Sequence, residues 1–219
     1  MHNSRGPNWL NVVARRLQWL AIPNIAVVLI GFQAFGFLLA LSKPELAQLL
    51  PLIPELILQG QVWRLISFLA VPMAMSPIWM LFGLWFQYFI LNSIESEWGA
   101  FKTTFYILTS VVLTIMFSLV FGYPVLGITD LTSTFFLAAA ALFPEQEIQI
   151  YFVIPVKMKF LGWLALAFLA FRFLQGDWMD RLFLCAIYSN YLIFFGPTML
   201  YRIRDWKRRR DYKASWKRP

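Results

Sequence analysis

The stretch Gly60-Gln61-Val62-Trp63-Arg64-Leu65-Ile66-Ser67-Phe68 decides the fold of this chain. It stands in a proline-rich segment, a few residues before a long apolar run. Tryptophan is enriched where a membrane meets water, and a long arginine side chain can reach a polar layer from there. The stretch therefore indicates a segment at a membrane surface, and its neighbours indicate what kind of membrane protein this is.

The composition favours a polytopic membrane protein with one embedded domain. Of 219 residues, 60% are hydrophobic and only 14% are charged, and the mean hydropathy is +0.64, which is too apolar for a soluble domain. The only cysteine, Cys185, excludes an intramolecular disulfide and makes a metal site unexpected. We expect no cofactor, because the sequence contains no metal-binding or nucleotide-binding motif.

Six apolar segments are candidates for helices that cross the membrane, which needs about twenty residues. They are Leu20–Leu41, Pro77–Ile94, Phe101–Phe121, Ile128–Phe143, Phe160–Leu174 and Met179–Tyr201. The sequence thus predicts an all-α polytopic membrane protein with six transmembrane helices. An even number of spans leaves both ends of the chain on the same side.

Basic residues predict that this side is the cytoplasm. Nine of the nineteen Lys and Arg lie within residues 201–219, and Arg5, Arg15 and Arg16 lie near the other end. Positive residues are enriched in cytoplasmic segments. We expect an integral protein of a bacterial cytoplasmic membrane, divided into a cytoplasmic segment (1–18), a membrane domain (19–201) and a basic cytoplasmic tail (202–219).

Residues 42–76, between the first two spans, contain four prolines and are too broken for a straight spanning helix. They predict an interfacial first loop with short amphipathic helices. The residues expected against lipid are Leu49, Leu50, Leu52, Ile53, Leu56 and Ile57. Those expected toward water are Lys43, Glu45, Gln48 and Glu55.

The fourth span is too short to cross alone. Sixteen residues, Ile128–Phe143, reach roughly 24 Å at about 1.5 Å each, against a hydrocarbon core about 30 Å thick. We expect the preceding residues 122–127 to dip into the bilayer where protein or water satisfies their polar groups. The alternative is a tilted helix that thins the bilayer locally.

Three motifs together resemble the rhomboid family of intramembrane serine proteases and its derlin-like inactive relatives. The first is Trp63-Arg64, the second is Glu95-x-x-x-Gly99 at the end of the second span, and the third is the turn Pro155-Val156-Lys157. The resemblance implies a six-helix rhomboid-like bundle with a short fourth helix. Residues 143–157 alternate polar and apolar side chains after a proline, and we expect a hairpin-like element at the cytoplasmic surface there.

The positions that carry catalysis in rhomboids hold other residues here. The family's Gly-x-Ser-Gly motif corresponds to Thr132-Ser133-Thr134, where Ser133 lacks the flanking glycines. The histidine of the sixth span is replaced by Ser189 or Asn190, and neither can accept a proton at neutral pH. The oxyanion-binding His-x-x-x-Asn pair corresponds to Trp79 and Gly83.

Two further residues complete the comparison with the family. The chain's only histidine is His2, outside every apolar segment. Gly196, after the histidine's position, is expected to let the fourth and sixth helices approach each other.

The resemblance implies a pseudoprotease that binds transmembrane segments of other membrane proteins, an adaptor in membrane-protein quality control or assembly. Thr129, Asp130 and Thr132 at the start of the fourth helix are the expected contacts with a client or partner. Expected partners are integral membrane proteins and a membrane protease or chaperone complex, not DNA. Two alternatives are a fixed structural subunit of a larger membrane complex and an active protease that uses Ser133.

The tail carries nine basic and two acidic residues with aromatic residues between them. Such a segment favours anionic lipid. Arg208, Arg209 and Arg210 are the expected contacts of the tail with lipid or a partner.

Overall fold

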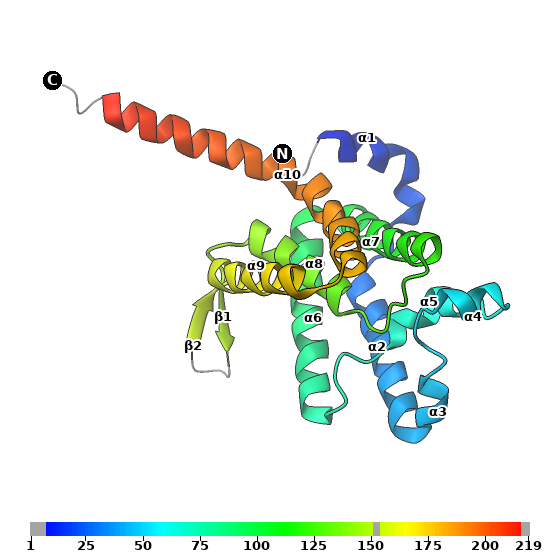
Figure 1. Ribbon diagram of the computed structural model, residues 1–219. Coiled ribbons are helices and arrows are strands. Elements are labelled where there is room, and N and C mark those ends of the chain that lie inside the picture. Colours follow the sequence, from blue (N-terminus) through cyan, green and yellow to red (C-terminus); the bar gives the residue numbers. More distant parts are fainter. Residues whose placement is uncertain (1–7, 151–153, 216–219) are drawn as a thin grey trace.

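The computed structural model describes residues 8–150 and 154–215, and it consists mainly of helices (Figure 1). The main helices are α2 (Ile25–Ser42), α6 (Pro77–Trp98), α7 (Ala100–Phe121), α8 (Thr129–Leu142), α9 (Met158–Gln175) and α10 (Trp178–Ser215). The short helices are α1 (Asn8–Leu17), η1 (Gln18–Leu20), α3 (Pro44–Ala47), α4 (Pro54–Leu58), α5 (Arg64–Ser67) and η2 (Phe68–Ala70). Two strands, β1 (Glu147–Ile150) and β2 (Ile154–Lys157), form one antiparallel hairpin.

Each predicted span overlaps one of these main helices. Within the described residues, α2, α6, α7 and α9 are long and apolar enough to cross a membrane, and α8 is a shorter apolar helix. The prediction of an all-α polytopic membrane bundle is confirmed. The helix α10 continues without a break past Tyr201, so the last span and the tail share one helix.

The first span begins later than the sequence predicts, at Ile25 rather than Leu20. Pro23 has no backbone N–H to donate, and Asn24 adopts a left-handed conformation with φ 56°. Such a residue cannot continue a right-handed helix. The chain therefore turns between η1 and α2.

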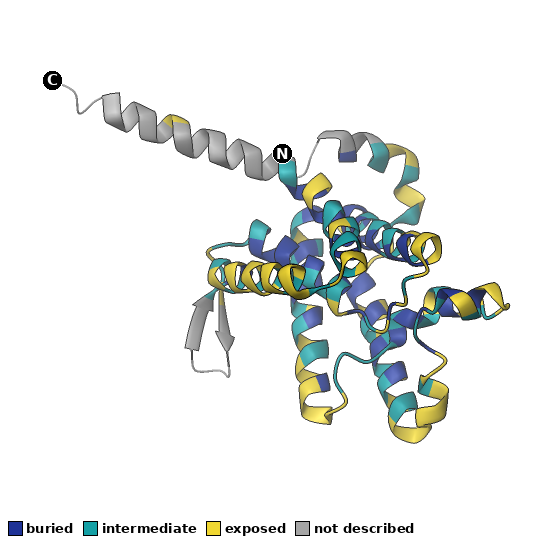
Figure 2. Ribbon diagram, viewed as in Figure 1, coloured by how far each residue is buried: buried dark blue, intermediate teal, exposed yellow. Residues whose placement is uncertain are grey.

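The short helix α8 lies at the centre of the bundle, where it packs against α6, α9 and α10. Figure 2 shows buried residues concentrated there and exposed residues along α9. Alanines 138–140 are buried and leave room for neighbouring helices. A Cβ on Gly162 of α9 would lie only 2.8 Å from the Cβ of Ala140, so this glycine permits close contact between α8 and α9.

The glycine expected to bring the fourth and sixth helices together does not do so. A Cβ on Gly196 would meet nothing within 4 Å. The expectation for Gly196 is therefore wrong, and the tightest glycine-mediated contact of α8 is with α9 instead.

The first loop is more deeply packed than the sequence predicts. Leu50, Leu52 and Ile57, all expected against lipid, are buried in the protein, and this part of the prediction is wrong. Leu52 exchanges backbone hydrogen bonds with Val125, of 3.1 and 2.8 Å. The first loop thus covers the segment between α7 and α8 and satisfies backbone groups of it, as a non-helical segment within a membrane protein requires.

The expected hairpin is confirmed, with Glu147 opposite Lys157 and Ile150 opposite Ile154. At its base, Glu145 forms ion pairs with Lys159 at 2.7 Å and with Lys157 at 3.0 Å. Hydrogen bonds from Lys159 and then Lys157 hold the pKa of the Glu145 carboxyl below its usual value. These contacts join the segment after α8 to the start of α9.

Candidate functional site

Arg64 is buried within the first loop and holds it together by hydrogen bonds. It is 2% exposed, and its Nη1 donates to the carbonyl oxygens of Pro51 at 2.8 Å and Gln48 at 3.3 Å. Its Nε donates to Oε1 of Gln61 at 2.8 Å. The neighbouring Trp63 is half exposed. Arginine suits this position because its planar group offers several donors in fixed directions.

Glu95 and Gly99 stabilise the C-terminal end of α6, the second predicted span. Oε1 of Glu95 accepts a 2.8 Å hydrogen bond from the backbone N–H of Asn24, which anchors the turn before α2. Gly99 has a φ of +83°, a conformation that suits glycine, and its N–H donates to the Glu95 carbonyl at 2.7 Å. Both motif residues therefore shape helix ends, as Arg64 shapes the loop.

Trp79 and Gly83 face different surroundings on α6. Trp79 is 56% exposed, whereas a Cβ on Gly83 would lie 3.5 Å from Cε of Met73. The Thr132 hydroxyl lies 3.8 Å from Sδ of the same methionine. Met73 thus occupies the space between Gly83 and Thr132.

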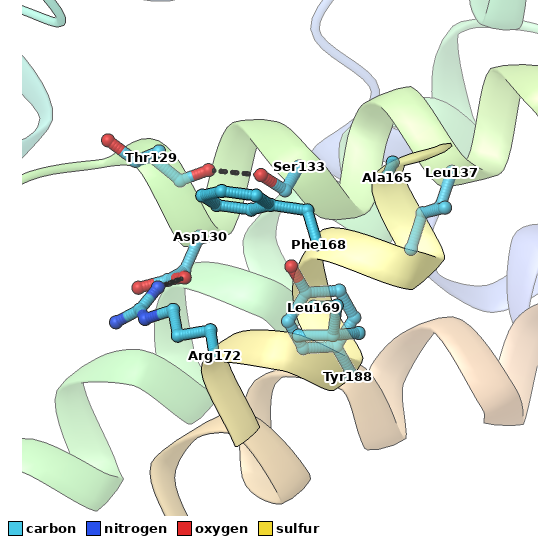
Figure 3. Close-up of a pocket in the computed structure, with 9 residues that line it drawn as sticks. All are labelled: Thr129, Asp130, Ser133, Leu137, Ala165, Phe168, Leu169, Arg172 and Tyr188. Atoms are coloured by element: carbon cyan, nitrogen blue, oxygen red, sulfur yellow. Dashed lines mark hydrogen bonds and ion pairs between the residues drawn. The ribbon is translucent and has the colours of Figure 1, made fainter. Parts of the chain in front are cut away.

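Ser133 lines a cavity of about 90 Å³ between α8, α9 and α10 (Figure 3). The residues around it are Thr129, Asp130, Ser133, Leu137, Ala165, Phe168, Leu169, Arg172 and Tyr188. The Ser133 hydroxyl donates to the Thr129 carbonyl one turn earlier, at 2.8 Å. Serines within helices often bond in this way to a carbonyl one turn earlier.

The residue of α10 that lines this cavity is Tyr188, and not Ser189 or Asn190. Ser189 donates to the Ala186 carbonyl of its own helix at 2.7 Å. Asn190 is fully buried and turns toward α7, where its Nδ2 donates to the Tyr106 carbonyl at 3.1 Å and to the Ser110 hydroxyl at 2.5 Å. Asn190 therefore joins α10 to α7.

An ion pair between Arg172 of α9 and Asp130 of α8 stands at one end of the cavity (Figure 3). Their side chains are 38% and 15% exposed. In the segment before α8, the Tyr123 hydroxyl donates a hydrogen bond to Asp180, which lies in the first turn of α10. Asp130 was predicted from the sequence as a site residue, but its partner Arg172 was not. The signal available was that Arg172 is an isolated arginine within a predicted span.

A second, more open cavity of about 540 Å³ is also lined by this ion pair. It shares Thr129, Asp130, Phe168 and Arg172 with the first and extends to residues 123–127 and Phe183. The two cavities are therefore lined, where they share residues, by hydroxyl, carboxylate and guanidinium groups. Such a lining can hold water and form hydrogen bonds to a polar guest.

The remaining predicted site residues lie in the tail. Arg208 is exposed on α10, and the side chains of Arg209 and Arg210 lie outside the described residues, as does His2. Across residues 8–150 and 154–215, no group of three His, Cys, Asp or Glu residues is placed to hold a metal ion.

Comparison with known proteins supplies the family. A family model described as the Rhomboid domain matches residues 59–183, more than half of the chain. The matched range begins just before Trp63-Arg64, includes Ser133 and ends before Tyr188. No curated protein sequence matches the chain. This integral membrane protein, with its packed first loop and short central helix, belongs to the rhomboid family.

Proposed function

We propose that the protein is a catalytically inactive rhomboid-like protein that binds transmembrane segments of other membrane proteins. In this role it serves as an adaptor in membrane-protein quality control or assembly. The client segment contacts the start of α8, at Thr129, Asp130 and Thr132. The basic tail contacts anionic lipid or the partner machine.

The surroundings of Ser133 support the absence of catalysis. A serine hydroxyl attacks poorly unless a base takes its proton. Of the ionisable residues that line its cavity, Asp130 is paired with Arg172, and a tyrosine such as Tyr188 has an ordinary pKa of about 10 and is protonated at neutral pH. The chain's only histidine, His2, stands far from Ser133 in the sequence.

The observation that carries the binding proposal is the Arg172–Asp130 pair, which lines two neighbouring cavities. Ionisable groups within a membrane domain are costly and usually mark a functional path. A cavity of about 90 Å³ is large enough to hold water. A client helix with a polar or helix-breaking residue is more easily accepted beside this wet zone than in lipid, where its polar groups have no partners.

The position of α9 supports access from the membrane. Only 11% of its most apolar window is buried, and Phe168, which lines both cavities, is 69% exposed. A client segment in the bilayer can therefore reach the cavity wall without crossing the rest of the bundle.

Affinity purification of the intact chain in mild detergent, with quantitative mass spectrometry, tests this function. A chain lacking residues 202–219 is the matched control for the tail. We expect a substoichiometric set of membrane proteins together with one protease or chaperone, and weaker recovery of the latter without the tail. A fixed-ratio partner set would instead favour a structural subunit, and unchanged recovery without the tail would count against tail docking.

A reactivity measurement tests inactivity separately. A fluorophosphonate probe attacks activated serines, and we expect no labelling of Ser133 above that of a Ser133→Ala variant. Labelling that depends on Ser133, or cleavage of a membrane-protein substrate, would overturn the proposal of an inactive protein.

A further inference from the structure

The helix α1 is too short to cross a membrane and is fixed to one end of the bundle. Its ten residues span roughly 15 Å at about 1.5 Å each. Leu10 is fully buried and belongs to the hydrophobic core, whereas Arg15 and Arg16 in the last turn are exposed. Trp19 of η1 follows and is 77% exposed. A short helix with exposed basic residues, followed by an exposed tryptophan, is typical of a membrane interface.

Hydrogen bonds fix this end of the chain to the turn between α6 and α7. The Ile22 N–H donates to the Thr104 hydroxyl at 3.2 Å, and that hydroxyl donates to the Ile22 carbonyl at 3.2 Å. Two residues on, the Asn24 N–H donates to Glu95 at 2.8 Å. The basic end of α1 and the start of α7 therefore belong to one rigid end of the molecule.

The start of α7 presents positive charge that no ion pair among the described residues balances. Its N-cap is Gly99, which has no side chain to cap the first N–H groups, and a helix start carries a partial positive charge. Lys102 stands in this first turn, is 7% exposed and has no ion pair with any described residue. Helical side chains tilt toward the helix start, and Lys102 carries a further positive charge in this first turn.

The nearby buried groups that lack partners do not supply the missing anion. Oε2 of Glu95 and Nε1 of Trp98 are buried without a hydrogen bond, but they are an acceptor and a donor three residues apart on α6, so one water can serve both. The other oxygen of Glu95 is engaged by Asn24. A negative group from outside the described residues can therefore bind at Lys102 and the α7 start.

We propose that this end of the molecule binds the phosphate of an anionic phospholipid headgroup. Lys102 and the first N–H groups of α7 hold the phosphate, Arg15 and Arg16 attract the anionic headgroup layer, and Trp19 inserts at the interface. A phosphate satisfies a helix start and a lysine at once. Lipid is the source of the phosphate because the surrounding surface is built for an interface. The residues of this site lie outside the tail segment 202–219, and the proposal does not depend on the proposed function.

Photocrosslinking in nanodiscs tests the proposal on the full chain. The probe is a phosphatidylglycerol analogue with a diazirine near the headgroup, compared with the matching phosphatidylcholine analogue. We expect phosphatidylglycerol to label peptides within residues 15–22 and 98–104. Arg15→Gln with Arg16→Gln, and Lys102→Met alone, should lower that labelling about fivefold for each charge, from about 1 kcal/mol per basic residue and 1.4 kcal/mol per tenfold.

Lys43→Met is the matched control, because Lys43 is an exposed lysine beside α3, at the other end of α2. It should leave the labelling unchanged. Equal labelling by both lipids, or labelling confined to residues 202–219, would overturn the proposal. Protection by millimolar inorganic phosphate would also overturn it, because the site would then take free phosphate rather than lipid. The surface pair Arg15 and Arg16 keeps the test valid should Lys102→Met fail to fold.

Discussion

Replacing Gly36 by alanine should separate α2 from the end of the first loop. A Cβ on Gly36 would lie 1.6 Å from the carbonyl oxygen of Ala70, where ordinary contacts begin near 3.4 Å. The backbone of η2 must therefore retreat by about 1.8 Å, the difference between those distances. The same movement stretches the hydrogen bond that Gln33 donates to the Leu69 carbonyl.

The expected loss in free energy of unfolding is about 2–3 kcal/mol. Overpacking a tight contact costs about 1–3 kcal/mol, with the upper end expected against backbone, and the weakened hydrogen bond adds about 1 kcal/mol. The better helix propensity of alanine returns up to about 1 kcal/mol.

Gly31→Ala is the matched control on the same helix, because a Cβ there meets nothing within 4 Å. It should leave stability unchanged or raise it by up to about 1 kcal/mol. Both variants can be compared by reversible unfolding in mixed micelles. Equal stability of the two would refute the close packing of α2 on η2.

Three further predictions follow from the polar contacts. Arg64→Met should lower stability by about 3 kcal/mol, because it leaves buried carbonyl groups of the first loop without donors; hydrogen exchange should accelerate in the loop, and Arg64→Lys should restore part of the protection. Asp130→Asn and Arg172→Gln should each destabilise by about 1–3 kcal/mol, less than a fully buried pair because both groups are partly exposed. The double variant should lose less than the sum of the two, and strict additivity in a double-mutant cycle would contradict the pairing. Because the pKa of Glu145 is lowered in the folded protein, mainly by Lys159, its contribution is present above the ordinary carboxyl pKa and is lost as the pH falls through the lowered value. The protection factors of the hairpin amides, which are corrected for the intrinsic exchange rate, should therefore be lower at pH 3 than at pH 7. A Glu145→Gln variant should not show this change.

Local patterns in the sequence were sufficient to predict the positions of most helices and of the hairpin. Apolar length is a property of each segment, so the positions of α6 and α7 follow directly from it. The hairpin follows from alternating side chains after Pro144. The start of α2 was missed because Pro23 and Asn24 act through backbone conformation rather than hydrophobicity.

Contacts between distant segments could not be predicted in the same way. The amphipathic pattern of the first loop gives one apolar face, but only the fold decides whether Leu52 meets lipid or Val125. The rotation of α10 about its own axis could not be predicted either, because a rotation by one residue places Ser189 instead of Tyr188 at the cavity. The partner of Asp130 lies 42 residues away on another helix.

The most direct test of the central claim is photocrosslinking from the cavity wall in the native membrane. A photoreactive amino acid at Thr129, with the same residue at lipid-facing Val120 of α7 as the control, reports which proteins touch each place. The account predicts that position 129 captures intact integral membrane proteins that position 120 does not, and that Asp130→Asn reduces their yield. Equal capture at both positions, or capture of fragments cut within their transmembrane segments, would contradict it.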